Sequence, residues 1–405
     1  MPSVADSLIV NSRDRVDASL AAAKVDLAEI NPVAQTLSFA EPLFADDIRF
    51  LELEPRLAEA IEEGQVLTFR GEPKDQVTIC SDDQTWEVKE AETSNSMLLV
   101  TSLLGNGTDT TSAEGSSSDE KLVVEKEVSG FYNTYLEMRP KRVGKDRLIQ
   151  LLNECPYCGP EHESDDCVKA ANKYTVSDLL DRVQSSRVEL ECQLNKLRVC
   201  VIDGYVRMLD FEYFARVSSL FLSLISENSW SHNSIPVDDA ISVLVELEPR
   251  NVLIKIVDWF TKKSDVHNID CDETVRQLNE DVVCRFHAEV ILRLVDKMIV
   301  SEFMQAWHGS VLDGVTPRMD QLEGLVLMKK ETTGAETIEL FSTEELPDDP
   351  AERFRAIFAA KPRWSADEIS HFIKDLAFGK DTISSLLMKH CRSSMVGKER
   401  FYCGK

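Results

Sequence analysis

Two cysteines at C-x-x-C spacing are the first residues in this sequence that could do chemistry. Cys155 and Cys158 enclose Pro156 and Tyr157, which is the pattern of a dithiol redox site. A redox pair needs its first thiolate at a helix N-terminus, where the helix dipole lowers the pKa of the thiol. Here the pair follows a helix predicted over residues 146–154, so the dipole opposes the thiolate. The position therefore argues against redox chemistry.

A structural zinc site is the better use of the same thiols. Together with His162 and Cys167, Cys155 and Cys158 give C-x2-C-x3-H-x4-C, which supplies four zinc ligands over a short loop. A Pro/Gly turn into an acidic linker explains the segment without a metal, and we prefer this interpretation. No cofactor is predicted.

Other signs of catalysis are missing from the sequence. There is no G-x-x-x-x-G-K-[ST] phosphate loop and no G-x-G-x-x-G after a strand. None of the seven histidines lies in an H-E-x-x-H or nucleophile-elbow setting. The residues therefore predict a binding protein that is not an enzyme.

The composition limits what such a protein can bind. The net charge of −26 over 405 residues argues against a general nucleic-acid coat, because affinity for phosphates comes from clustered Lys and Arg. Any contact with DNA must be local. Ten irregularly spaced cysteines and no apolar N-terminal leader predict reduced thiols in the cytosol or nucleus. No apolar run approaches the ~20 residues that cross a bilayer, so no membrane contact is expected.

The clearest partner-binding signal is a group of basic residues near the end of the chain. They are interleaved with Phe401 and Tyr402, and they are Lys389, Arg392, Lys398, Arg400 and Lys405. Lys389 and Arg392 lie three apart, which on a helix places them on one side. The group would form a basic, aromatic hairpin tip on an acidic chain. The alternative is that these charges only complement a helix dipole.

A second basic run opens the helix predicted at 146–154. It consists of Arg139, Lys141, Arg142 and Lys145. We favour a solvated helix start over a contact with phosphate or with an acidic partner.

Residues 173–210 show the elements that would position such groups. Thr175 can cap a first helix, and Ser186 with Glu189 has the spacing of a capping box that opens a second. Asp203-Gly204 then forms a two-residue hairpin turn between alternating strands. Two helices followed by a β-hairpin indicate a winged helix; an ordinary helical hairpin beside a β-hairpin is the alternative. The plan recurs over 276–346 and 347–405, where Ser365 and Glu368 give another capping box.

These patterns predict an α+β fold with a β-rich, barrel-like N-terminal docking domain followed by tandem winged helices. The unpaired edges of its sheet would favour a partner. The predicted parts are an N-terminal tail or helix (1–38), the β-rich docking domain (39–143, with a flexible loop at 101–121), a first winged helix with a helical extension (144–275), a second (276–346) and a third (347–405).

Several stretches resemble one known family. They are FLELEP (50–55), AETSN (91–95), NTYLEMRP (133–140), KYTVSDLL (173–180), DGYVRMLDFEY (203–213), ERFRAIFAAKPRWSADEI (352–369) and SLLMKHCRSSM (385–395). The chain resembles, from about Leu51 to its end, the sister chromatid cohesion proteins of the DCC type (defective in sister chromatid cohesion). The family has N-P-Y-x-G-P without paired cysteines where this chain has residues 153–160, which weakens the zinc and redox interpretations.

The resemblance implies a nuclear, non-catalytic accessory subunit of the alternative replication factor C clamp loader. The β-rich part would join strands of the small chromosome-transmission-fidelity subunit and of the clamp loader's large subunit. The winged helices would bind the catalytic subunit of DNA polymerase epsilon and contact DNA without sequence preference. The chain would contact PCNA only indirectly. The loading and unloading of PCNA by the other subunits would serve DNA replication and sister chromatid cohesion. Matching positions of the family's basic terminal wing are Lys389, Arg392 and Lys405.

Two alternatives stay open. A winged-helix DNA-binding regulator would need a recognition helix rich in base-reading residues, and Arg187, Gln193 and Asn195 are few beside Glu189 and Glu191. The other is a small zinc-stabilised interaction protein.

Overall fold

The computed structural model of the chain describes residues 18, 20–24, 34–41, 48–100, 103, 123–263, 275–331, 334–379, 381–397 and 399–405. Most of the predicted tail (1–38), most of the predicted loop (101–121) and Lys398 lie outside the described residues. The fold is mixed α+β, as the sequence predicts. It divides into two compact units, residues 1–63 with 88–139 and residues 64–87 with 140–405. Residues 64–87, which the sequence places in the β-rich domain, group with the C-terminal part.

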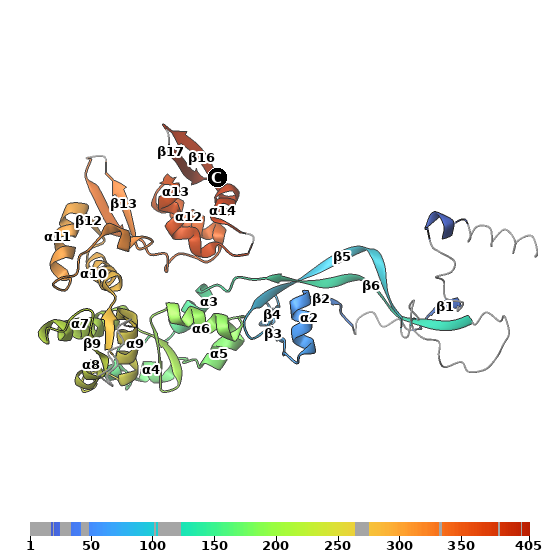
Figure 1. The fold of residues 1–405 in the computed structure, drawn as a ribbon, viewed down its shortest axis with the longest axis horizontal. Helices are drawn as coiled ribbons and strands as arrows, with labels where there is room; N and C mark the ends of the chain where they lie inside the picture. The colour runs from blue at the N-terminus through green and yellow to red at the C-terminus, as the bar shows by residue number, and fades with distance from the viewer. Residues whose placement is uncertain are drawn as a thin grey trace, which may run out of the picture. The chain divides into compact units, whose positions relative to one another are not determined.

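The first unit is built around strands β5 (Thr85–Val100) and β6 (Val123–Pro140) (Figure 1). Strands β1 (Ala34–Phe39) and β2 (Leu51–Glu52) both pair parallel to β6, and α2 (Pro55–Glu62) follows β2. The described strands form an open sheet in the order β1-β6-β5-β4-β3, with β2 also on β6, and not a closed barrel. The predicted barrel-like closure is therefore absent from these strands.

The second unit begins with the hairpin of β3 (Thr68–Arg70) and β4 (Thr78–Cys80). The first segment, residues 140–210, follows with α3 (Asp146–Leu152), η2 (Pro160–His162), α4 (Asp166–Ala170), α5 (Val176–Arg182), α6 (Arg187–Lys196), β7 (Val199–Ile202) and β8 (Tyr205–Met208). Thr175 caps α5 in a full capping box, and the Ser186 side chain caps α6, as predicted. Asp203 and Gly204 both have positive φ, as a tight two-residue hairpin turn requires.

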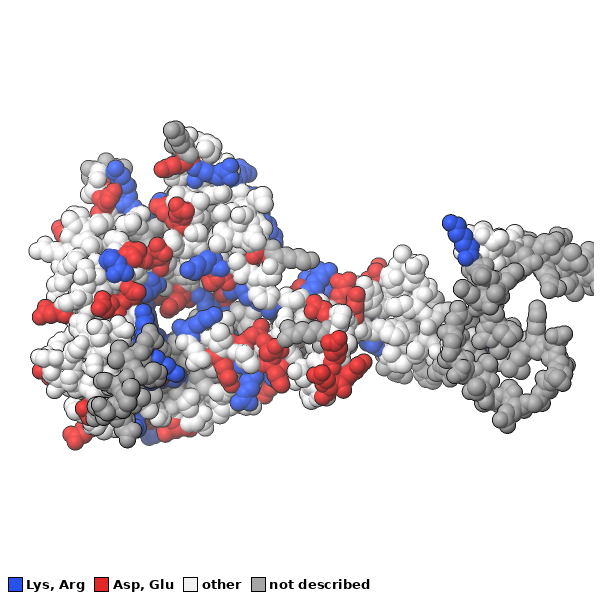
Figure 2. All heavy atoms as spheres, viewed as in Figure 1, with Lys and Arg blue, Asp and Glu red and all other residues white. Residues whose placement is uncertain are grey.

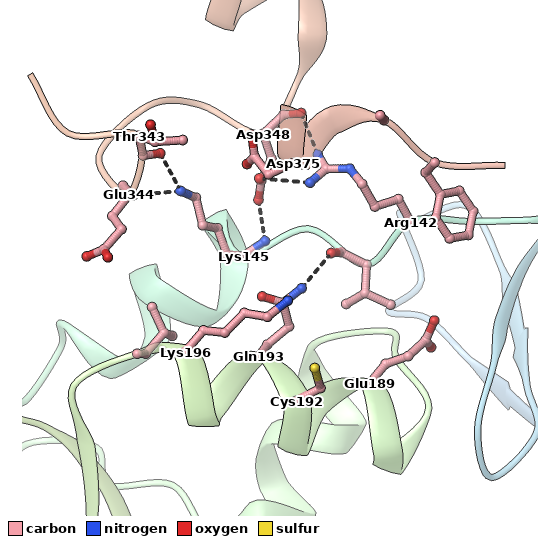
Figure 3. A pocket seen from close by; sticks show the side chains of 14 residues that line it. Arg142, Lys145, Glu189, Cys192, Gln193, Lys196, Thr343, Glu344, Asp348 and Asp375 are labelled. Carbon is pink, nitrogen blue, oxygen red and sulfur yellow. Dashed lines mark hydrogen bonds and ion pairs between the residues drawn. The ribbon is translucent and has the colours of Figure 1, made fainter. Parts of the chain in front are cut away.

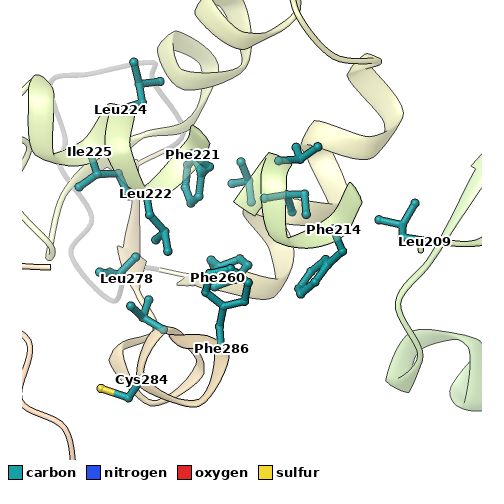
Figure 4. Close-up of a cluster of buried hydrophobic side chains, with 14 of the residues drawn as sticks. Leu209, Phe214, Phe221, Leu222, Leu224, Ile225, Phe260, Leu278, Cys284 and Phe286 are labelled. Carbon is teal, nitrogen blue, oxygen red and sulfur yellow. The ribbon is translucent and has the colours of Figure 1, made fainter. Parts of the chain in front are cut away.

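A helical segment and a second segment share one core. The helical segment, residues 211–263, contains α7 (Phe211–Glu227), β9 (Ile235–Pro236), α8 (Val237–Leu244), α9 (Arg250–Phe260) and β10 (Thr261–Lys263). The second segment, residues 275–340, contains β11 (Val275–Leu278), α10 (Glu280–Leu294), β12 (Lys297–Ile299), α11 (Val300–Ser310), η3 (Met319–Leu322), β13 (Val326–Lys330) and β14 (Glu336–Leu340). Phe214, Phe260 and Phe286 meet edge-to-face or stacked, with ring centroids 5.3–6.2 Å apart (Figure 4). One buried cluster therefore crosses the predicted boundary at 275.

A third segment, residues 347–405, repeats the helices-then-hairpin order. It contains α12 (Pro350–Ala360), β15 (Trp364–Ser365), α13 (Ala366–Ile373), η4 (Lys374–Leu376), α14 (Ile383–His390), β16 (Cys391–Val396) and β17 (Glu399–Gly404). The predicted capping box of Ser365 and Glu368 is present in both directions. Strand β17 lies between β15 and β16. Trp364, only 1% exposed, lies in a separate buried cluster that also includes Leu327 of β13.

No helix in the described part of the chain is long and apolar enough to span a bilayer.

Candidate functional site

The third segment differs in charge from the rest of the chain. Residues 347–405 contain 11 Lys and Arg against 8 Asp and Glu, within a chain whose net charge is −26. Figure 2 shows Lys and Arg side chains gathered at the upper edge of this segment. On a chain that is acidic overall, contact with an anionic partner requires a local excess of Lys and Arg, and this segment has one.

The structure places the predicted basic hairpin residues on three elements. Lys389 lies in the last turn of α14, Arg392 in β16 and Arg400 in β17, and all three are exposed. Within the residues that the structure describes, none of the three forms an ion pair. Since Arg392 lies in a strand, the helical spacing to Lys389 predicted from the sequence does not apply.

The strand register separates the two arginines. Arg392 is opposite Cys403, whereas Arg400 is opposite Met395. Because side chains alternate along a strand, the two guanidinium groups lie on opposite faces of the hairpin. A flat anionic surface could meet only one of these faces at a time.

Lys405 has a different part in the same hairpin. Its ammonium group donates hydrogen bonds to the backbone carbonyls of Met388, at 2.9 Å, and of Lys389. These carbonyls belong to the last turn of α14, where a helix leaves its C=O groups without partners. The structure thus gives Lys405 a capping contact, which is the second interpretation drawn from the sequence.

The other basic run, Arg139 to Lys145, is engaged within the chain. Arg139 pairs with Glu137 at 2.8 Å in the first unit. In the second unit, the guanidinium of Arg142 contacts Asp348 at 3.3 Å and its backbone carbonyl at 2.7 Å. The Lys145 ammonium donates to the carbonyls of Thr343 and Glu344, both at 2.8 Å. For Lys141, the backbone N–H donates to the Thr85 carbonyl at 2.9 Å.

Asp348 is the centre of these contacts (Figure 3). Its carboxylate is 9% exposed and accepts the backbone N–H groups of Lys145 and of Asp146, the latter at 2.9 Å. Arg142 approaches the same carboxylate at 3.3 Å and Arg353 at 3.5 Å. Burial lowers the pKa of the Lys145 ammonium, and the nearby Arg353 lowers it further. We call Arg142, Lys145, Asp146, Asp348 and Arg353 the Asp348 joint.

A cleft of about 590 Å³ lies beside the Asp348 joint. Its floor is one face of α6, and its other wall comes from the linker after β14 and from the third segment (Figure 3). The side chains from α6 are Glu189, Cys192, Gln193 and Lys196, and those opposite include Thr343, Glu344, Asp375 and Phe378. No sequence pattern predicts this cleft, because its walls are far apart along the chain.

The cysteine-containing loop is held by an arginine. Arg207, 2% exposed, donates to the carbonyls of Cys155 at 2.8 Å and Pro156 at 3.1 Å, and pairs with Glu163 at 3.0 Å. Burial raises the pKa of the Cys158 thiol. No three His, Cys, Asp or Glu side chains are grouped for a metal among the described residues. His162 instead faces Asp165 at 3.4 Å, and Cys167 is exposed on α4.

Comparison with known proteins identifies the family. The sequence model described as "Sister chromatid cohesion protein Dcc1" matches residues 48–373. The human protein named sister chromatid cohesion protein DCC1 is 34% identical over 394 residues, covering 96% of this chain and 98% of its own length. The Xenopus laevis DCC1 is 35% identical over 95% of this chain and 96% of its own. The Saccharomyces cerevisiae DCC1 is 24% identical over 88% and 96%.

The chain belongs to the Dcc1 family. The family match ends at residue 373, so it contains the whole Asp348 joint and stops before the basic hairpin. The joint is therefore a feature of the family-matched part of the fold.

Proposed function

We propose that this member of the Dcc1 family is a non-catalytic accessory subunit of the cohesion-type replication factor C clamp loader. It links the loader to DNA polymerase epsilon and to DNA, and it supports the loading and unloading of PCNA in the nucleus. Membership of a cohesion protein family supports the cohesion role. The observation that carries the binding role is the group of Lys389, Arg392 and Arg400 on an acidic chain: all three are exposed, and none has an ion pair among the described residues.

The first unit is the proposed docking site for the other clamp-loader subunits. Apolar side chains remain uncovered on its strands, including Phe39 at 58% and Phe131 at 45% exposed. Strand β1 lies at the end of the strand order among the described strands, and an edge strand is a template on which another chain can pair. Strands from the small chromosome-transmission-fidelity subunit and from the large subunit would cover both kinds of surface.

The three helix-and-hairpin segments are the proposed winged helices. In each, helices precede an antiparallel hairpin: β7–β8, β13–β14 and β16–β17. In the last two, a short strand just before a helix, β12 or β15, adds to the hairpin. This arrangement supports the assignment, in which Arg392 and Arg400 of strands β16 and β17 would lie on the wing of the third segment.

The decisive experiment neutralises the hairpin without touching its capping contact. The variant Lys389→Ala/Arg392→Ala/Arg400→Ala keeps Lys405, and its matched control is Arg355→Ala/Arg363→Ala/Lys374→Ala. The control also loses three exposed cations of the third segment that have no ion pair among the described residues. Binding of the full chain to the polymerase catalytic domain and to duplex DNA is measured at two salt concentrations.

Weaker DNA binding in the hairpin variant alone, with a salt slope shallower by about 0.9 for each lost phosphate contact, supports a phosphate clamp. Loss of polymerase binding alone makes the hairpin a protein-docking site. Equal behaviour of the hairpin variant and its control would refute a specific role for the hairpin.

The structure favours neither alternative from the sequence. On α6, the carboxylate of Glu189 accepts a hydrogen bond from Thr85 at 2.6 Å and is thus engaged within the chain. The loop proposed for zinc is held by Arg207.

A further inference from the structure

One face of α6 lies across a cleft from a distant part of the chain. Helix α6 lies directly before the hairpin β7–β8, which in a winged helix is the position of the helix that enters the DNA major groove. Cys192, Gln193 and Lys196 on this face line the cleft of about 590 Å³. That volume suits a small ligand, for which sites are typically about 300–1,000 Å³. A duplex must instead surround the helix with a groove about 12 Å wide.

The contact that brings the third segment to this cleft is polar. The first and third segments have separate hydrophobic clusters, with no buried residue in common. They meet at the Asp348 joint, where Asp348 accepts two backbone N–H groups at the start of α3. Lys145 reaches across to the linker carbonyls of Thr343 and Glu344. A contact made by charges and caps, and not by a shared core, can open without unfolding either partner.

The third segment also has a place about which it can turn. Its core includes Leu327 of β13, and Phe341 after β14 packs against that core, so its apolar attachment is to the second segment. Thr343 donates to the His371 carbonyl at 3.4 Å on the same side. Opening the joint would therefore separate the third segment from α6 while its attachment to the second segment remains.

We propose that the Asp348 joint is an autoinhibitory contact, which holds the third segment closed over α6 and keeps this face from a nucleic-acid duplex. The face is available only when the joint opens. The inference concerns α6 and not the basic hairpin, and the closure does not depend on the proposed clamp-loader role.

The test uses the full chain and two thiols as reporters. Both thiols are exposed to water, but Cys192 lines the cleft and Cys167 on α4 does not. A small alkylating reagent should label both thiols. A maleimide that carries a long polymer should label Cys167 readily and Cys192 at least about tenfold more slowly, since open minor states are typically 0.1–10% populated. Labelling is assigned to each cysteine by mass spectrometry.

Two variants open the joint in different ways. Asp348→Ala removes the shared carboxylate, and Lys145→Gln removes only the contacts to the linker carbonyls. Each should accelerate polymer labelling of Cys192 by about tenfold or more and leave Cys167 unchanged. Asp367→Asn is the control, because this exposed residue of the same segment also loses one negative charge but has no side-chain partner among the described residues.

The outcomes decide the proposal. The proposal is overturned if the polymer labels Cys192 and Cys167 equally fast in the unmodified chain. It is also overturned if neither variant accelerates the labelling of Cys192. Labelling of Cys391, buried in the third core, would reveal that Asp348→Ala unfolds this segment, and Lys145→Gln then decides alone. Duplex binding should rise in the joint variants and not in Asp367→Asn. If polymer labelling of Cys192 accelerates in the joint variants but duplex binding does not rise, the joint closes over α6 but DNA is not the partner that it excludes.

Discussion

Asp146 and Asp348 cap each other across 202 positions of sequence. The Asp146 carboxylate accepts the backbone N–H of Asp348 at 2.8 Å, and the Asp348 carboxylate accepts the backbone N–H of Asp146 at 2.9 Å. Lys145, at the N-cap position of α3, offers no side-chain cap to its own helix. A function that a capping box performs within four residues is here divided between two segments.

This reciprocal cap predicts a local loss of stability in Asp146→Ala. Removing a capping carboxylate costs about 0.5–2 kcal/mol, so hydrogen exchange at the amide of Asp348 should accelerate by about tenfold. Asp166→Ala on α4 is a suitable control, because Asp166 is fully exposed and its ion pair with Lys169, at 3.9 Å, is long and open to solvent. Unchanged exchange in Asp146→Ala would show that the cap does not stabilise the joint.

The ion pair of Glu163 and Arg207 should be one of the most sensitive in the chain. Arg207 is 2% exposed, and Glu163→Ala would leave its buried charge without a carboxylate. The expected loss is about 3–5 kcal/mol in urea unfolding, the usual cost of removing one partner of a buried pair. Glu161→Ala breaks a pair with Arg216 in which both side chains are about half exposed, and should cost at most about 1 kcal/mol. Equal losses in both variants would contradict this assignment.

The same carboxylate predicts a pH dependence. Burial opposes ionisation of Glu163, but hydrogen bonds from Arg207 and Lys173 outweigh it, so the pKa lies below the ordinary 4.5. The unfolded chain then binds more protons than the folded chain in that range. The stabilising contribution of the ionised Glu163 is therefore present above about pH 4.5 and lost as the pH falls through the folded pKa. Glu163→Gln should therefore flatten the acid limb of a stability-against-pH curve. An unchanged slope would exclude Glu163 as its source.

Thr85 should anchor residues 64–87 to α6. Its buried hydroxyl donates to Glu189 at 2.6 Å and accepts the backbone N–H of Ser186 at 2.8 Å. Thr85→Val keeps the shape and removes both bonds, at a cost of about 1–3 kcal/mol. Limited proteolysis should then cut within 64–87 sooner, whereas Thr93→Val, at a half-buried position of the other unit, should not change this cleavage.

Metal removal should leave the protein unchanged. Arg207 binds the carbonyls of Cys155 and Pro156, so the loop does not need a metal for its shape. We expect chelator-dialysed protein to contain no zinc in elemental analysis and to unfold at the same urea concentration as before. Stoichiometric zinc that survives dialysis, and is lost in Cys155→Ser/Cys158→Ser, would restore the zinc hypothesis.

The sequence predicted what is local. The capping residues Thr175, Ser186 and Ser365 were found because a cap and its partner lie three residues apart. The hairpin at Asp203-Gly204 was found because few residue pairs tolerate two positive φ angles.

The sequence did not predict contacts between distant segments. Arg207 sits in an alternating strand and gives no local sign that its partner is Glu163. Asp348, in an acidic pair before a proline, is typical of a helix start, and only the fold brings it to α3. For the same reason, the basic pattern at Arg142 and Lys145 predicts a solvated helix start and not their contacts with residues 343–348.

The shared aromatic core sets how this protein can be dissected. The ring of Phe286, from the second segment, lies 5.3 Å from Phe260 and 5.6 Å from Phe214 in the helical segment. A fragment ending at the predicted boundary near 275 would present Phe214 and Phe260 to water, and a fragment beginning there would present Phe286. Both pieces should be poorly soluble, so experiments on single modules of this chain would report on exposed cores and not on native binding.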